Sequence, residues 1–174
     1  MSTLVVYFSR TGNTRSVAEA VAERLRADHE PIVELGPARR GLRGWTRSVM
    51  DSVLHNLPAI RSPIHQPSAY DLVVIGTPVW SASMAAPVRT YLVTHQPEFR
   101  EVAFFCTQGG SGAERAFAQM SGVSRLLPRA TLAIGEGQLH TDLSLAEIDR
   151  FVGELRPVTL ARTNGSSHIP SIPH

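Results

Sequence analysis

The sequence contains one cysteine, Cys106, and no lysine. A single cysteine excludes an internal disulfide framework and any zinc site built from several cysteines. No apolar run reaches the roughly 18 residues that a membrane-spanning helix needs. The first residues, Met1 to Leu4, also lack the basic and then apolar pattern of a signal peptide. We therefore expect a cytoplasmic protein without a membrane span.

Charged residues are also scarce, at 18% of the chain, and the formal net charge is only +2. All 17 basic residues are arginine, and five of them gather between residues 39 and 61, where Asp51 is the only acidic residue. Such a basic segment can meet phosphate groups or an acidic partner protein, although a solvated helix face also explains it. We expect no nucleic-acid partner. The arginines of the basic segment are Arg39, Arg40, Arg43, Arg47 and Arg61.

The chain has 174 residues, of which 43% are hydrophobic, and this is the size and composition of one globular domain. Beyond Pro157 the composition shifts to small and polar residues with further prolines. This shift predicts a flexible C-terminal tail over residues 157–174. The folded domain is then expected to span residues 1–156.

Apolar runs and helix-like stretches alternate along the domain. The first run is continuous, as in strands that a parallel sheet buries on both faces. Predicted strands cover residues 4–8, 31–35, 71–76, 101–106 and 130–134, and predicted helices cover residues 13–26, 42–57, 84–93, 113–126 and 144–155. The alternation predicts a three-layer α/β fold with a doubly wound, five-stranded parallel sheet of order 2-1-3-4-5.

Two local signals refine the predicted helices. Pro87 falls in the first turn of the helix over residues 84–93, where proline is tolerated. Ser144 followed by Glu147 has the pattern of a capping box, which predicts that the last helix begins at Ser144.

Ligands bind to a doubly wound sheet beyond the carboxyl ends of its strands, which directs attention to three loops. The first loop, residues 9–14, combines hydroxyl side chains and Gly12 with the free amides of a helix N-terminus, a combination that suits a phosphate group. It has neither a Gly-Lys-Ser/Thr ending nor a Gly-x-Gly-x-x-Gly pattern. Because it has no lysine to neutralise a triphosphate, a monophosphate suits it better.

The other two loops add an aromatic residue and a glycine-rich segment. Residues 76–83 contain Trp80, against which a flat ring could stack. Residues 107–112 contain three glycines, whose backbone amides can approach a ligand closely. Each loop alone also fits an ordinary turn, but three of them at one edge of the sheet favour a ligand site.

These segments together resemble the flavodoxin family, whose members bind flavin mononucleotide (FMN). Residues 5–14 resemble the family's phosphate-loop signature, residues 70–80 resemble the segment leading into its first isoalloxazine loop, and residues 104–112 resemble its second. The resemblance extends from Thr3 to about Leu155. It implies a flavodoxin-like fold with FMN as the cofactor and no metal.

The resemblance also implies a role for each matching residue. The 5′-phosphate would be held by Ser9, Arg10, Thr11, Gly12, Asn13 and Thr14. One edge and face of the isoalloxazine would be lined by Thr77, Pro78, Val79, Trp80 and Ser81. The pyrimidine side would be wrapped by Thr107, Gln108, Gly109, Gly110 and Gly112. No catalytic side chain is implied, because the flavin carries the chemistry. His140 is the histidine to test as a proton donor.

Two departures from the family pattern favour an enzyme. Electron-carrier flavodoxins are strongly acidic and commonly place a tyrosine over the outer flavin face, whereas this chain is slightly basic and its third loop has no aromatic residue. An uncovered flavin face can admit a substrate. We therefore expect an FMN-dependent oxidoreductase, of the NAD(P)H or quinone type, that passes electrons to a small acceptor.

Other functions remain open from the sequence. The main alternative is a non-enzymatic electron carrier that docks a partner redox protein, with the basic segment as the docking patch. A doubly wound domain that has lost flavin and binds another phosphorylated ligand is a third. Residues 38–69 form a longer connection than usual, which could cover the site or form the contact of a homodimer.

Overall fold

The computed structural model of the chain describes residues 1–36 and 57–156. Its central sheet has five parallel strands, β1 (Thr3–Tyr7), β2 (Asp28–Pro31), β3 (Leu72–Trp80), β5 (Glu101–Gln108) and β6 (Thr131–Gly135). Their order is β2-β1-β3-β5-β6, and the short strand β4 (Ser83–Met84) pairs antiparallel with β3. Counting the parallel strands along the chain, this confirms the predicted order 2-1-3-4-5.

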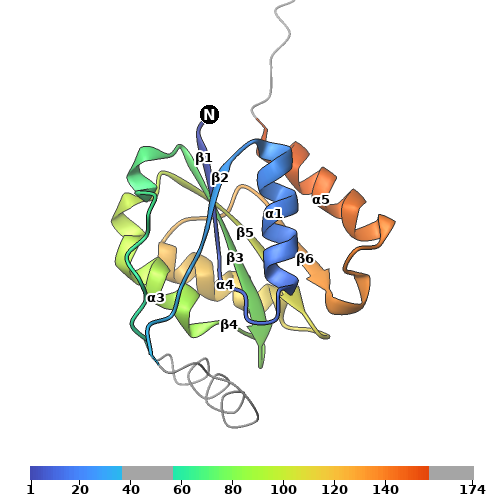
Figure 1. The fold of residues 1–174 in the computed structure, drawn as a ribbon, viewed down its shortest axis with the longest axis horizontal. Coiled ribbons are helices and arrows are strands. Elements are labelled where there is room, and N and C mark those ends of the chain that lie inside the picture. Colours follow the sequence, from blue (N-terminus) through green and yellow to red (C-terminus); the bar gives the residue numbers. More distant parts are fainter. Residues whose placement is uncertain (37–56, 157–174) are drawn as a thin grey trace, which may run out of the picture.

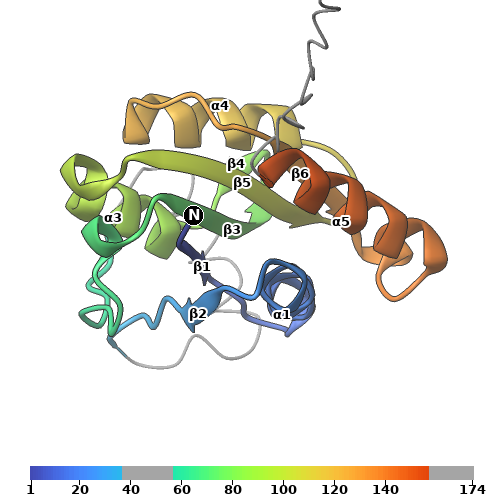
Figure 2. The ribbon, with the colours of Figure 1, turned by 90° about the horizontal axis from the view of Figure 1, so that it is seen from above.

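Helices cover both faces of the sheet. On one face lie α1 (Asn13–Leu25) and α5 (Asp142–Leu155), and on the other lie α3 (Ala86–His95) and α4 (Ala113–Ser124) (Figures 1 and 2). Three single turns of 3₁₀-helix, η1 (Pro67–Ala69), η2 (Gln96–Glu98) and η3 (Glu136–Gln138), complete the described elements. The three-layer α/β architecture is therefore confirmed. Among the helices that the structure describes, none combines the length and apolarity needed to cross a membrane.

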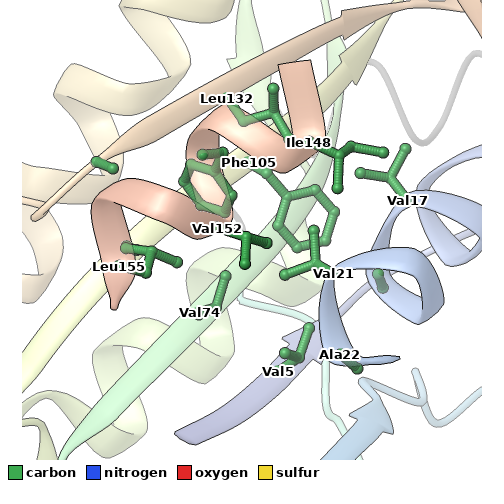
Figure 3. Packing of buried hydrophobic residues seen from close by; sticks show 14 of the residues in the cluster. Val5, Val17, Val21, Ala22, Val74, Phe105, Leu132, Ile148, Val152 and Leu155 are labelled. Atoms are coloured by element: carbon green, nitrogen blue, oxygen red, sulfur yellow. The ribbon is translucent and has the colours of Figure 1, made fainter. Parts of the chain in front are cut away.

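The core consists of two apolar layers separated by the sheet. Successive strand residues point to opposite faces. Val5 and Val74 pack against α1 and α5 (Figure 3), whereas their neighbours Val6 and Ile75 belong to the cluster beneath α3 and α4. All four side chains are fully buried. Because both faces of these strands are covered, their sequences are continuously apolar.

The prediction for the second strand was wrong. The apolar run over residues 31–35 was expected to form it, but β2 is Asp28–Pro31. β2 lies at the edge of the sheet and pairs only with β1, so most of its residues stay exposed and no apolar run marks them. The end of the apolar run instead forms one isolated antiparallel bridge between Glu34 and Ile60, around which Leu35 N donates to Ala59 O and Arg61 N donates to Val33 O, both at 2.8 Å.

Three element boundaries also differ from prediction. Residues 76–83 were expected to be a loop, but β3 continues through them to Trp80 and turns directly into β4. The following helix therefore begins at Ala86 rather than at residue 84, with Pro87 in its first turn as expected. The last helix begins at Asp142, and its cap is Thr141 rather than Ser144, because Thr141 Oγ1 accepts a hydrogen bond from Ser144 N at 3.3 Å.

Some predictions fall outside the described residues. They are the helix over residues 42–57, apart from its last residue, and the tail over residues 157–174. Of the basic segment, only Arg61 is described, and its side chain is exposed.

The centre of the sheet contains a position that only glycine can fill. Gly76 of β3 lies directly opposite Phe105 of β5, and a Cβ atom at Gly76 would lie 2.0 Å from Phe105 Cζ. We expect Gly76→Ala to lower the free energy of unfolding by at least about 2 kcal/mol, because the fully buried ring of Phe105 would have to shift within the packed core. Urea denaturation of the protein without ligand measures the change.

Gly153 of α5 provides the matched control for this prediction. It is exposed, and a Cβ atom there would meet nothing within 4 Å. Gly153→Ala should raise the free energy of unfolding by roughly 0.5–1 kcal/mol, since alanine favours a helix interior. Equal effects of the two substitutions would show that the Gly76–Phe105 contact is not the cause.

Candidate functional site

A cavity of about 530 Å³ lies at the edge of the sheet where the parallel strands end. This volume is within the roughly 300–1,000 Å³ of small-molecule and cofactor sites. Residues from all three predicted loops and from one further segment line the cavity. Its lining residues are Arg10, Thr11, Asn13, Thr14, Pro78, Val79, Trp80, Ser81, Thr107, Gly109 and Glu136.

The loop between β1 and α1 presents a helix N-terminus to this cavity. Gly12 precedes α1 with φ of 103°, a left-handed conformation that favours glycine, and no side chain caps the helix. The first amides of a helix have no partners within it, so they are available to a ligand. The first turn of α1 also carries no acidic residue. This end of the cavity is therefore suited to an anion.

Ser9 shapes this loop without lining the cavity. Its Oγ accepts a hydrogen bond from Gly12 N at 3.2 Å, which closes the turn that leads into α1. Thr11 and Asn13 follow on the cavity side, and Thr11 is exposed. The predicted phosphate loop therefore divides into residues that line the cavity and residues that hold its turn.

The second wall of the cavity is the end of β3 and the hairpin that joins it to β4. Trp80, the last residue of β3, is half-buried and packs edge-on against Phe8, with ring centroids 6.1 Å apart and ring planes at 89°. Ser81 and Ala82 form the turn, with φ of 50° and 55°. Positive φ at both central residues is typical of a two-residue hairpin, but it strains residues other than glycine and asparagine.

Thr77 supports the hairpin from within the protein. It is fully buried, its Oγ1 donates to Pro78 O at 2.9 Å, and the same oxygen accepts from Ala85 N at 3.0 Å. These bonds join the end of β3 to the start of α3. Thr77 was predicted to contact the cofactor, but it is not among the residues that line the cavity.

The third loop packs directly against the second. Gly112 has φ of 114°, and a Cβ atom there would lie only 2.6 Å from Ala82 Cα. Gln108 Oε1 accepts a hydrogen bond from Ala113 N at 3.0 Å and so holds the first turn of α4. Gly110 contributes no lining atom, and of the predicted glycines only Gly109 faces the cavity.

A buried hydrogen bond joins the first loop to the third. Thr14 Oγ1 and Thr107 Oγ1 lie 2.8 Å apart, and both residues are buried while also lining the cavity. The residues come from α1 and β5, 93 positions apart in the sequence. This contact fixes the distance between the helix N-terminus and the glycine-rich loop.

Glu136 is a cavity residue that the sequence analysis missed. It begins η3 directly after β6, and its Oε2 would lie 3.6 Å from a Cβ atom at Gly109. Its side chain is exposed and lines the cavity. The only available signal was its position after the fifth strand, at the ligand edge of the sheet.

His140 lies elsewhere. It is exposed, with φ of 64°, and borders a separate small hollow between α1 and α5. It is absent from the lining of the candidate cavity, so its role as a proton donor stays a prediction without structural support. Cys106 is fully buried in β5, and burial raises the pKa of its thiol to about 12. It therefore remains a thiol at neutral pH, as a core residue does.

Comparison with known proteins agrees with the fold. A family model described as Flavodoxin matches residues 2–153, so the chain belongs to the flavodoxin family. No curated protein is significantly similar to the chain in sequence.

Several solved structures share its fold. One is a flavoprotein from Lactobacillus acidophilus in complex with FMN, which has a TM-score of 0.69 and 21% identity over 86% of this chain and 97% of that one. Another is oxidised Flavodoxin 2 from Bacillus cereus, with a TM-score of 0.57 and 14% identity over 88% and 97% of the two chains. A third is a WrbA-like flavodoxin from Agrobacterium tumefaciens, with a TM-score of 0.54 and 16% identity over 87% and 95%.

The hydrogen bond between Thr14 and Thr107 should stabilise the protein even without a ligand. We expect Thr14→Val and Thr107→Val each to lower the free energy of unfolding by about 1–3 kcal/mol, because each leaves a buried hydroxyl unpaired. The double variant should lose less than the sum of the two by at least about 0.5 kcal/mol. Denaturation in phosphate-free buffer measures this coupling.

Thr131 of β6 is exposed and serves as the control for these valine substitutions. Thr131→Val should change the free energy of unfolding by less than about 0.5 kcal/mol. Additive effects of Thr14→Val and Thr107→Val would contradict a direct bond between the two side chains.

Proposed function

We propose that the chain is an FMN-dependent oxidoreductase that binds FMN in the described cavity and passes its electrons to a small acceptor such as a quinone. The main observation behind this proposal is that one cavity contains both an uncapped helix N-terminus and a tryptophan at the end of β3. The first suits a phosphate dianion, and the second suits a flat aromatic ring. The flavoprotein from Lactobacillus acidophilus that shares the fold was solved with FMN, which supports the proposal.

The chemistry of the lining residues fits this cofactor. The hydroxyl of Thr11 and the side chains of Arg10 and Asn13 would hold the phosphate together with the first amides of α1. Pro78, Val79 and Trp80 would line one side of the isoalloxazine. The backbone at Gly109 would approach its pyrimidine side, because a glycine brings no side chain into the cavity.

Bound FMN supplies the electron chemistry, since its ring accepts an electron pair from a reductant and returns it to an acceptor. The chain's own contribution is to bind, to orient and to limit access. Trp80 is the only aromatic residue in the lining among the residues that the structure describes, and the third loop, with Gly109, Gly110 and Ser111 exposed, brings no ring over the cavity. A small acceptor could therefore approach the flavin from that side.

An electron carrier that docks a redox protein is the second candidate. It is favoured by the family itself and by the likeness to Flavodoxin 2 from Bacillus cereus. The basic segment would then attract an acidic partner, and the association would weaken with salt. The cytoplasmic location and the homodimer that the sequence suggested stay predictions.

The 5′-phosphate of FMN should contribute strongly to the affinity of the protein for this cofactor. We expect the protein to bind FMN at least about 100-fold more tightly than riboflavin, because several hydrogen bonds to a charged group are made together. Thr11→Val should weaken FMN binding roughly tenfold and leave riboflavin binding unchanged. Quenching of flavin fluorescence on titration measures both dissociation constants.

Ser111 provides a matched control, because it is also an exposed hydroxyl residue near the cavity but does not line it. Ser111→Ala should leave both dissociation constants unchanged. Equal affinity of the wild-type protein for FMN and riboflavin would contradict the placement of the phosphate at α1.

The two candidate functions differ in what they need besides FMN. We expect the FMN-loaded protein alone to oxidise NADH or NADPH in the presence of a small quinone, with a rate that salt changes little. Steady-state absorbance at the nicotinamide band measures this activity, and protein without FMN is the control. Activity that appears only after a partner redox protein is added would favour the carrier instead.

A further inference from the structure

Arg89 of α3 is a buried cation without a charged partner among the residues that the structure describes. Its side chain is only 7% exposed. Its Nη2 donates a hydrogen bond to Gln119 Oε1 at 3.2 Å, and its Nε has no partner among the described residues. Burial lowers its pKa, although a guanidinium stays protonated at neutral pH. Arginine is rarely buried without a carboxylate, because desolvating the charge is costly.

Gln119 of α4 links this arginine to the hairpin of the cavity. Its Oε1 also accepts from Met84 N at 3.4 Å, and its Nε2 donates to Ser83 Oγ at 3.2 Å. Arg89 can only donate, so it requires the oxygen of the amide to face it. The amide nitrogen is thereby directed toward Ser83, and the opposite orientation would place two donors against each other.

The hairpin needs such support because it is short and strained. Two residue pairs hold it, Val79 with Met84 and Trp80 with Ser83. Its turn places Ser81 and Ala82 at positive φ, which costs non-glycine residues free energy. Val79, Trp80 and Ser81 all line the cavity, so the conformation of this hairpin decides the shape of the cavity wall.

We propose that Arg89 is a positioning residue for this wall: through Gln119 it holds the β3–β4 hairpin, and its positive charge, which no described carboxylate pairs with, favours the more negative, reduced form of the bound FMN. The inference rests on the proposed function for its second part only. Two hydrogen bonds separate the guanidinium from β4, which pairs with the wall of the cavity. Arg89, Ser83 and Met84 are all buried, so the charge is weakly screened along this link.

Three variants separate the two effects. Arg89→Met removes the charge and the donor but keeps much of the apolar volume. Arg89→Lys keeps the charge but loses the planar group of donors. Gln119→Met keeps the charge of Arg89 and removes the link to the hairpin. Arg150→Met, at an exposed position of α5, controls for the loss of one arginine.

Amide hydrogen exchange in residues 79–85 of the protein without FMN measures the positioning role. We expect exchange to accelerate at least tenfold in Arg89→Met and in Gln119→Met, and to stay unchanged in Arg150→Met. The global free energy of unfolding of Arg89→Met should not fall, because replacing a buried unpaired charge by an apolar side chain is often neutral or stabilising. Unchanged exchange in Arg89→Met would overturn the positioning role.

The electrostatic role is measured by the ratio of two dissociation constants, one for oxidised and one for reduced FMN. The midpoint potential of the bound FMN gives this ratio. In Arg89→Met the constant for reduced FMN should rise roughly tenfold relative to that for oxidised FMN, as expected for the loss of one weakly screened charge. In Arg89→Lys and Gln119→Met the ratio should stay near that of the wild type. A ratio unchanged in Arg89→Met would overturn the electrostatic role.

The outcomes distinguish this inference from the proposed function. If the wild-type protein does not bind FMN, the proposed function and the electrostatic role fail, while the exchange measurement still decides the positioning role. If Arg89→Met does not fold, Arg89→Lys and Gln119→Met replace it in the exchange measurement. Unchanged exchange in both would then overturn the positioning role.

Discussion

The parallel pairing of β1, β3 and β5 is the constraint on which the candidate site depends. These strands pair residue by residue, Val5 with Val74 and Val74 with Ala103, so their carboxyl ends meet at one edge of the sheet. The loop before α1, the β3–β4 hairpin and the glycine-rich loop follow directly from those ends (Figure 1). A change of register by one residue would exchange the two buried faces of a strand, so the core also fixes the site.

Sequence reasoning predicted the parts of this arrangement that burial controls. The strands around Val5, Val74 and Ala103 were predicted because their two covered faces leave a continuous apolar run in the sequence. β2 was misplaced because an edge strand can remain polar, and Asp28 and His29 of β2 are exposed. The strand propensity of individual residues does not indicate which strand will lie at the edge of the sheet.

The parts of the site that were missed depend on contacts between distant segments. The hairpin after Trp80 has no Asn-Gly or Asp-Gly signal, and a glutamine from α4 binds Ser83, directly after its Ser81–Ala82 turn. Glu136 belongs to no motif and reaches the cavity only because β6 ends beside β5. Thr77 shows the opposite case, since it matches the family's motif yet its hydroxyl is used within the protein.

Two features that cost free energy lie at or near the cavity wall, in addition to others elsewhere in the described fold, such as the positive φ of Arg26, Arg125 and His140. Ser81 and Ala82 adopt positive φ, and Arg89 is buried without a carboxylate among the described residues. Each of these features is unfavourable alone, and each is tolerated because the two apolar layers of the core stabilise the domain. A protein selected for stability alone would replace them with Asn-Gly and an apolar side chain. At the cavity they give one wall a defined shape and charge, which a ligand site needs.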